Sequence, residues 1–139
     1  MVKANVDLTT ILGSVTLPNP VMTASGTAGY GSELSEYMDL QEIGAIVVKS
    51  LHAEKWEGNL PPRLHPTPSG MLNSVGLQGP GIKAWLDEKL PSLRDSNARI
   101  VVSIWGSTVK EFTEAALLLR DAPPEVVAIE INASCPNLE

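Results

Sequence analysis

Runs of apolar, mostly β-branched residues recur along this chain, and this feature constrains its fold most. The run at 45–50 stays apolar until Lys49, and the runs at 99–105 and 126–131 lead into Gly106 and into an Asn-rich loop. Continuous apolar runs of this length are typical of strands buried on both faces of a parallel sheet. Because helix-patterned stretches separate them, the sequence predicts an α/β fold.

Other segments complete the predicted order of elements. Thr108 is the expected cap of the clearest helix, which ends before Pro123. The opening residues alternate loosely around Gly13, which indicates a hairpin. Prolines and glycines crowd the middle of the chain, where we expect an irregular region. The segments are a hairpin at 6–17, a strand at 21–26, helices at about 32–40, 82–93 and 108–120, and the irregular region at 51–82.

Four predicted strands with intervening helices fit either of two architectures. One is a doubly wound sheet, and the other is half of an eight-stranded barrel. Periodicity does not choose between them. No GxGxxG follows the first strand and no GxxxxGK[ST] occurs, which weakens the dinucleotide-binding and P-loop versions. The length of 139 residues suits one domain with a hydrophobic core.

Composition excludes several classes of protein. A formal net charge of -6 without a Lys or Arg cluster argues against nucleic-acid binding. The apolar stretches are too short to cross a bilayer, and the first residues lack the apolar core of a secretory signal. Cys135 is the single cysteine, which excludes an intrachain disulfide and fits the cytoplasm. His52 and His65 lack metal-ligand spacing, so no metal site is expected.

Polar residues stand where each predicted strand ends, and reactive groups gather at that edge of parallel α/β folds. Lys49 has a bland interpretation, a snorkelling side chain with its head in water. A fixed cation there would instead hold an anionic ring or carboxylate, or form a Schiff base if desolvated. The polar residues are Ser25, Lys49, Ser50, Ser103 and the loop 132–137.

Cys135 lies in a loop beyond the last strand, between Asn132 and Asn137. Free cysteines are often buried and inert, but a loop after a strand is a poor place for core packing. A proton-transfer or nucleophilic role is therefore favoured. The two asparagines either support the turn or offer amides that match the edge of a pyrimidine or flavin.

The segment 73–81 is rich in glycine and precedes a predicted helix. It is either a plain turn or a loop whose backbone N–H groups approach a carboxylate or ring. The tryptophans are expected in the core or at its rim rather than in a stacking platform. They are Trp56, Trp85 and Trp105.

Four motifs together resemble those of class 1 dihydroorotate dehydrogenases, in the same order and spacing. The resemblance covers essentially the whole chain and implies residues 1–139 to be a single truncated domain, the N-terminal half of a (β/α)8 TIM barrel that carries FMN. The isolated chain would then bind FMN weakly. The motifs are Thr23-Ala24-Ser25-Gly26, Val48-Lys49-Ser50, Asn73-Ser74-Val75-Gly76-Leu77-Gln78 and Asn132-Ala133-Ser134-Cys135-Pro136-Asn137.

The resemblance implies oxidation of dihydroorotate to orotate in pyrimidine (UMP) biosynthesis. Cys135 would remove a proton from C5 while a hydride passes from C6 to the flavin, and Lys49 would contact both flavin and substrate. A thiol ordinarily ionises with a pKa of about 8.5, so turnover is expected to rise with pH. The implied cofactor-binding residues are Ser25, Lys49, Ser50, Ser103 and Asn132. The implied substrate-binding residues are Lys49, Asn73, Ser74, Val75, Gly76, Leu77, Asn132 and Asn137.

The segment 76–81 resembles the subclass that passes electrons through an iron-sulfur and FAD subunit to NAD, as a homodimer within a heterotetramer. Two residues depart from the family's pattern, because Gly79 and Ser103 stand where asparagine is common. Another flavin-dependent pyrimidine oxidoreductase of the dihydropyrimidine dehydrogenase kind, a lysine Schiff-base lyase and an inactive fragment are the alternatives.

Overall fold

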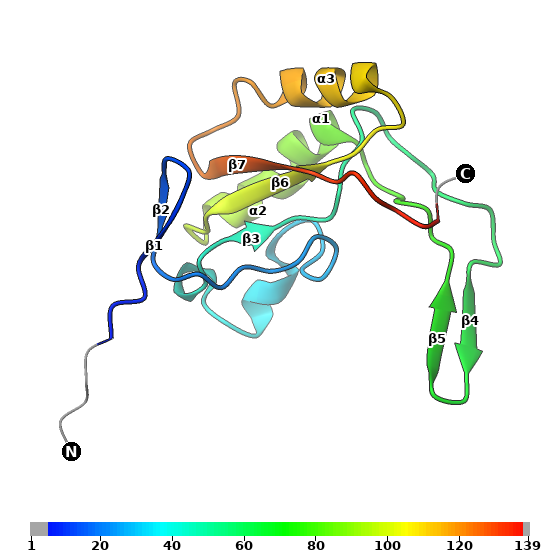
Figure 1. Cartoon of the computed structure of the whole chain (residues 1–139), viewed down its shortest axis with the longest axis horizontal. Helices are drawn as coiled ribbons and strands as arrows, with labels where there is room; N and C mark the ends of the chain where they lie inside the picture. The colour runs from blue at the N-terminus through cyan, green and yellow to red at the C-terminus, as the bar shows by residue number, and fades with distance from the viewer. Residues whose placement is uncertain (1–5, 138–139) are drawn as a thin grey trace.

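The computed structural model of this chain describes residues 6–137 and shows a mixed α/β arrangement (Figure 1). Elements η1 and η2 are 3-10 helices, and η3 is a π-helical stretch that joins α1 to α2. The elements are β1 (Thr10–Leu12), β2 (Val15–Leu17), η1 (Ser32–Glu36), η2 (Leu40–Glu42), β3 (Ile46–Val47), β4 (Leu64–Thr67), β5 (Gly70–Asn73), α1 (Ile82–Ala84), η3 (Trp85–Lys89), α2 (Leu90–Arg94), β6 (Ile100–Ile104), α3 (Val109–Leu118) and β7 (Val126–Ile131).

Strands β3, β6 and β7 form a parallel sheet in that order, which follows the order of the chain. The predicted strands at 99–105 and 126–131 are confirmed as β6 and β7. Strand β6 is central, and all of its residues are buried. Strand β3 is shorter than the predicted 45–50, although isolated parallel bridges pair Leu51 with Ile104 of β6 and Ala45 with Met22. Before the sheet, β1 and β2 pair antiparallel around Gly13.

The predicted strand at 21–26 is wrong, because this segment keeps only a parallel bridge between Met22 and Ala45. The Thr23 side chain explains the difference. Its hydroxyl accepts a hydrogen bond from the Val47 N–H at 2.8 Å and donates to the Val47 carbonyl at 3.2 Å. The Thr23 side chain thus occupies the Val47 N–H and carbonyl, which would otherwise bond the backbone of a strand at 21–26.

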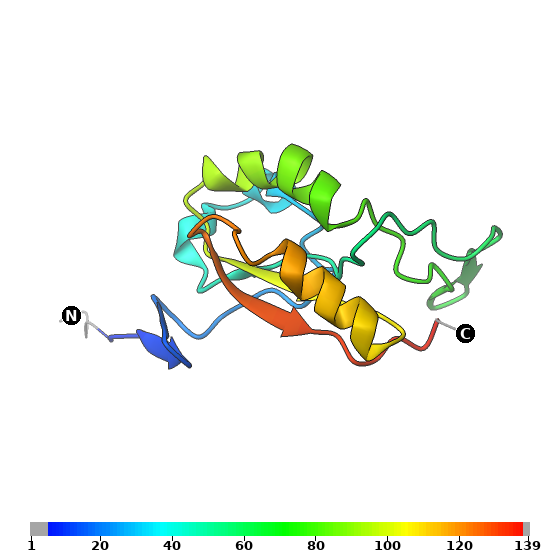
Figure 2. The same ribbon diagram turned by 90° about the horizontal axis from the view of Figure 1, so that it is seen from above.

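The two faces of the sheet bury different partners. The helices α1, α2 and α3 lie along one face (Figure 2), where Ile100 and Val102 of β6 pack in a cluster with the buried Trp85 and Leu93. On the other face, Val47 and Val101 pack with Leu17 of β2. Because side chains alternate along a strand, Lys49 and Ser103 follow Val47 and Val101 on this second face.

The helices differ in part from expectation. Thr108 caps α3 by accepting a hydrogen bond from the Glu111 N–H at 3.2 Å, so the predicted helix is confirmed. Residues 82–94 are helical as predicted, with the π-helical stretch inside. The helix predicted at 32–40 is present only in part, as the 3-10 helix η1 over Ser32–Glu36. Asp39 accepts a hydrogen bond from the Gln41 N–H at 2.9 Å and starts a separate 3-10 turn.

The region expected to be irregular contains an antiparallel hairpin of β4 and β5, which projects from the body of the molecule (Figure 1). Its residues are exposed, including Leu64, Met71 and Leu72. Beyond β5 the chain returns to the body, where Trp56 and Gly79 form an antiparallel bridge. Across residues 6–137, no helix is both long and apolar enough to span a membrane.

Candidate active site

Three serine hydroxyls meet at the carboxyl ends of the sheet strands, and we name Ser25, Ser50 and Ser103 the hydroxyl cluster. The Ser50 hydroxyl shares hydrogen bonds of 2.9 Å with both of the others. The Asn132 amide also donates to it, at 2.9 Å. The structure therefore brings together predicted site residues from four separate segments, as expected for this edge of a parallel α/β sheet.

Burial divides these residues into two layers. Ser103 is 0% exposed and Ser50 is 1% exposed, so these two hydroxyls form the inner layer. Ser25 and Asn132 are only partly buried and form the outer layer. The Asn132 side-chain oxygen accepts a hydrogen bond from the Ser134 N–H at 3.1 Å. Asn132 thereby joins the hydroxyl cluster to the segment 132–137, which we name the Cys135 loop.

Lys49 and Cys135 lie at the same end of the sheet, within range of each other's charge. Burial lowers the pKa of Lys49 below its ordinary value, and an ionised Cys135 acts in the opposite direction by attracting the ammonium. Both side chains are partly buried. The electrostatic contact therefore links Lys49 to the Cys135 loop.

Residues 73–78, which we name the Asn73 loop, lie against the Cys135 loop. The Asn137 amide donates a hydrogen bond to the Asn73 side-chain oxygen at 3.3 Å. Gly76 is buried with a φ of 70°, and its carbonyl accepts a hydrogen bond from the Trp56 indole at 3.0 Å. Leu77 also has a positive φ, of 53°, which is uncommon for a residue with a side chain. Ser74 and Val75 are partly buried in the same loop.

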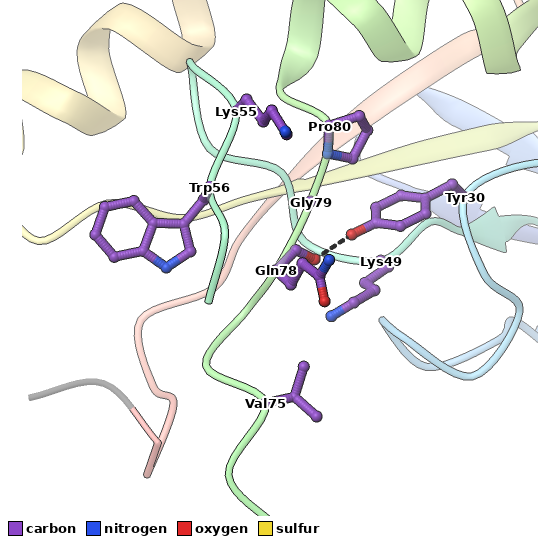
Figure 3. Close-up of a pocket in the computed structure, with 8 residues that line it drawn as sticks. All are labelled: Tyr30, Lys49, Lys55, Trp56, Val75, Gln78, Gly79 and Pro80. Atoms are coloured by element: carbon purple, nitrogen blue, oxygen red, sulfur yellow. Dashed lines mark hydrogen bonds between the residues drawn. The ribbon is translucent and has the colours of Figure 1, made fainter. Parts of the chain in front are cut away.

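A cavity of about 440 Å³ opens beside Lys49 (Figure 3). The Lys49 side chain reaches toward the Asn73 loop between Val75 and Gln78. A bound ring could meet the ammonium and the loop together there. The lining residues are Tyr30, Lys49, Lys55, Trp56, Val75, Gln78, Gly79 and Pro80.

Tyr30 is a lining residue that sequence reasoning missed. Its hydroxyl donates a hydrogen bond to the Gln78 carbonyl, and burial raises its pKa to about 12. A Cβ placed on Gly79 would lie 2.8 Å from this hydroxyl. The tyrosine therefore occupies the space of a side chain at position 79, which gives a steric reason for the glycine there. No local signal marks Tyr30, because its partner lies 48 residues away.

The tryptophans occupy the core and its rim, as predicted. Trp85 and Trp105 are buried, whereas Trp56 is 41% exposed. The His52 ring packs against both Trp56 and Trp105, with ring centroids 5.8 Å and 5.0 Å away. This supports the interpretation of His52 as a packing residue. His65 is exposed in β4.

Comparison with known proteins identifies the family. The model of the family described as dihydroorotate dehydrogenase matches residues 7–139. The chain belongs to the dihydroorotate dehydrogenase family. Among similar relatives is the protein named "Dihydroorotate dehydrogenase B (NAD(+)), catalytic subunit" of Thermoanaerobacter pseudethanolicus, which is 53% identical over 92% of this chain and 42% of its own length. The protein of the same name from Alkaliphilus metalliredigens is 46% identical over 100% of this chain and 45% of its own.

The chain thus spans less than half the length of the curated relatives that it matches. A solved structure, "Crystal structure of DHODH in complex with ferulenol from Eimeria tenella", superposes with a TM-score of 0.68 at 19% identity. That match covers 96% of this chain and 38% of the other. The likeness supports the mixed α/β fold as part of a larger architecture.

Proposed function

We propose that the protein carrying this chain oxidises dihydroorotate to orotate, a step of pyrimidine biosynthesis. The names of the relatives support this, since they agree on the activity at about half sequence identity. One structural observation carries the proposal. Lys49 lies within range of the charge of Cys135, and the hydrogen bond from Asn137 to Asn73 joins the Cys135 loop to the Asn73 loop.

The residues at this end fit a flavin, and we propose FMN. Ser25 and Asn132 offer polar atoms at the outer side of the buried Ser50 and Ser103, and Lys49 supplies a positive charge. A flavin bound there would accept a hydride from the substrate. In this arrangement Ser25, Lys49 and Asn132 would contact the flavin, whereas Ser50 and Ser103 would hold those contacts in place.

The oxidation breaks two C–H bonds, and this chain supplies a group for the proton. We assign Cys135 as the base, whose thiolate sulfur takes the proton from C5. The electron pair of that bond forms the C5=C6 double bond as a hydride leaves C6. The Lys49 ammonium would stabilise the thiolate before transfer and attract the carboxylate of the substrate.

The Asn73 loop and the Cys135 loop would hold the pyrimidine ring. The amides of Asn73, Asn132 and Asn137 match the alternating N–H and C=O groups of its edge. The backbone of residues 74–77 would bind the ring or its carboxylate, because the glycine allows close approach. The present hydrogen bond between Asn137 and Asn73 places the two amides side by side.

The wider assembly is also a proposal. The sheet order, which follows the chain, supports one half of a (β/α)8 barrel, with residues 1–139 as a truncated single domain. The relatives' printed name, a catalytic subunit linked to NAD(+), supports a separate electron-transfer subunit. We propose that this subunit carries an iron-sulfur centre and FAD, and that the assembly is a heterotetramer around a homodimer. We propose the cytoplasm as the location, because a reducing compartment keeps a thiol free of disulfides.

The test uses the protein expressed from its complete reading frame. We expect dihydroorotate, and not dihydrouracil, to bleach the flavin absorbance. We expect Cys135→Ala to retain the flavin and reduce it slowly, with Cys135→Ser intermediate and shifted to higher pH. Rapid flavin reduction by Cys135→Ala would refute the base assignment. Borohydride trapping of substrate on Lys49 would favour a Schiff-base lyase instead.

A further inference from the structure

Asn59 connects the two loops that carry the candidate chemistry. Its side-chain amide donates hydrogen bonds to the Ser74 carbonyl at 2.8 Å and to the Asn137 carbonyl at 3.0 Å. Ser74 belongs to the Asn73 loop, and Asn137 ends the Cys135 loop. An amide nitrogen has two hydrogens, so this group is fully used in joining the loops.

Other contacts hold the Asn59 side chain in this position. Its backbone N–H donates to the Val75 carbonyl at 3.0 Å, and its carbonyl accepts from Arg63 at 3.2 Å. A Cβ on Gly76 would lie 2.8 Å from the Asn59 side chain, so the backbone of the Asn73 loop packs closely against the Asn59 amide. Asn59 itself is partly buried. The amide is therefore confined, and its two acceptors are fixed relative to each other.

We propose that Asn59 is a positioning residue, which sets the distance between the base on the Cys135 loop and the ring held by the Asn73 loop. This inference rests on the proposed function. Asn59 acts through the two loops rather than on the substrate. Proton transfer from carbon requires the sulfur and the ring carbon at a fixed separation, and a misplacement of about 1 Å can lower a rate by about 100-fold.

The decisive variant is Asn59→Asp, which keeps the shape of the side chain but replaces two donors with acceptors. A carboxylate would then face two carbonyl oxygens, and the loops would separate. The matched control is Asn19→Asp. Asn19 lies away from this site and likewise donates its amide to a backbone carbonyl, that of Glu42, at 2.8 Å. The control imposes the same chemical change on a purely structural contact.

Two measurements on the flavin-loaded full-length protein separate positioning from general stability. For Asn59→Asp we expect kcat per bound flavin to fall about 10- to 100-fold, with flavin content unchanged. We also expect iodoacetamide to alkylate Cys135, followed by mass spectrometry of the peptide that contains it, several-fold faster because its loop is released. For Asn19→Asp we expect both values to equal those of the unmodified protein, even where thermal stability falls equally.

Unchanged kcat and unchanged alkylation in Asn59→Asp would overturn the proposal, as would equal effects of the two variants. Failure of the proposed function gives a different result, because the unmodified protein would then not oxidise dihydroorotate. In that case the alkylation rate of Cys135 still tests the connection, since it needs no turnover. An alkylation rate that is the same in Asn59→Asp and the unmodified protein would refute it.

Discussion

Replacement of Ser50 by alanine tests the hydroxyl cluster, because this side chain is the common partner of the others. The Ser50 hydroxyl is 1% exposed and contacts Ser25, Ser103 and the Asn132 amide, each at 2.9 Å. Its loss leaves the Ser103 hydroxyl, which is 0% exposed, without this partner. By contrast, Ser25 and Asn132 are partly buried and can turn to water.

The expected cost of Ser50→Ala follows from these contacts. A net hydrogen bond contributes about 1 kcal/mol, and a buried unpaired hydroxyl costs about 1 to 3 kcal/mol. We therefore expect the free energy of unfolding to fall by about 2 to 4 kcal/mol. Ser103→Ala should cost only about 1 kcal/mol, because Ser50 keeps two partners.

The double variant with both Ser50→Ala and Ser103→Ala provides the check. It removes the unpaired hydroxyl as well as its partner, so its loss should be smaller than the sum of the two single losses by about 1 kcal/mol or more. Urea unfolding followed by tryptophan fluorescence measures all three, because Trp85 and Trp105 are buried. Additive losses would show that the Ser103 hydroxyl does not depend on Ser50, which would refute the reasoning.

The other predictions concern charge and backbone. Burial lowers the pKa of Lys49, so the folded state binds fewer protons there than the unfolded state does. The free energy of unfolding should therefore rise with pH between that lowered pKa and about 10.4. If Lys49→Met melts at a higher temperature than the unmodified protein, the difference in melting temperature should shrink over this range. In Tyr37→Phe, Tyr30 is the remaining tyrosine of this sequence, and its tyrosinate absorbance should appear near pH 12 rather than near pH 10. The free energy of unfolding should fall between these two pH values, because the unfolded state loses the phenol proton first. A titration near pH 10 would contradict burial of the phenol. Gly76→Ala should lower the free energy of unfolding by about 1 to 2 kcal/mol because of its φ of 70° alone. Gly70→Ala is the control, because its added Cβ would lie 3.8 Å from the nearest atom and should cost little. Equal melting temperatures of the two variants would contradict this prediction.

Sequence patterns predicted the elements whose hydrogen bonds are local or whose strands are deeply buried. Strand β6 and helix α3 followed from an apolar run and from the cap at Thr108. The strand at 21–26 failed because the Thr23 hydroxyl replaced backbone pairing. The hairpin of β4 and β5 was missed because proline in a segment argues against a strand. Pro66 nevertheless lies in β4, and because this two-stranded hairpin is exposed, the N–H group that proline lacks costs little there.

Site residues that follow strands were predictable in position, because parallel strands end at one edge. Ser25, Ser50 and Asn132 meet there as this argument requires. Asn59 and Tyr30 were not predictable in the same way. Asn59 contacts a residue 78 positions away and Tyr30 one 48 positions away, so only the folded chain brings these partners together.

Burial of Ser103 favours one direction of donation through the hydroxyl cluster. The Ser103 hydroxyl is 0% exposed and, within residues 6–137, pairs with Ser50, so donation to the Ser50 oxygen is the arrangement that leaves no buried hydrogen unpaired. Ser50 already accepts from the Asn132 amide and therefore passes its own hydrogen to Ser25. Ser25 is left with a hydrogen that points outward. A molecule bound at this edge of the sheet would therefore meet the Ser25 hydroxyl as a hydrogen-bond donor, and it would need an acceptor atom at that position.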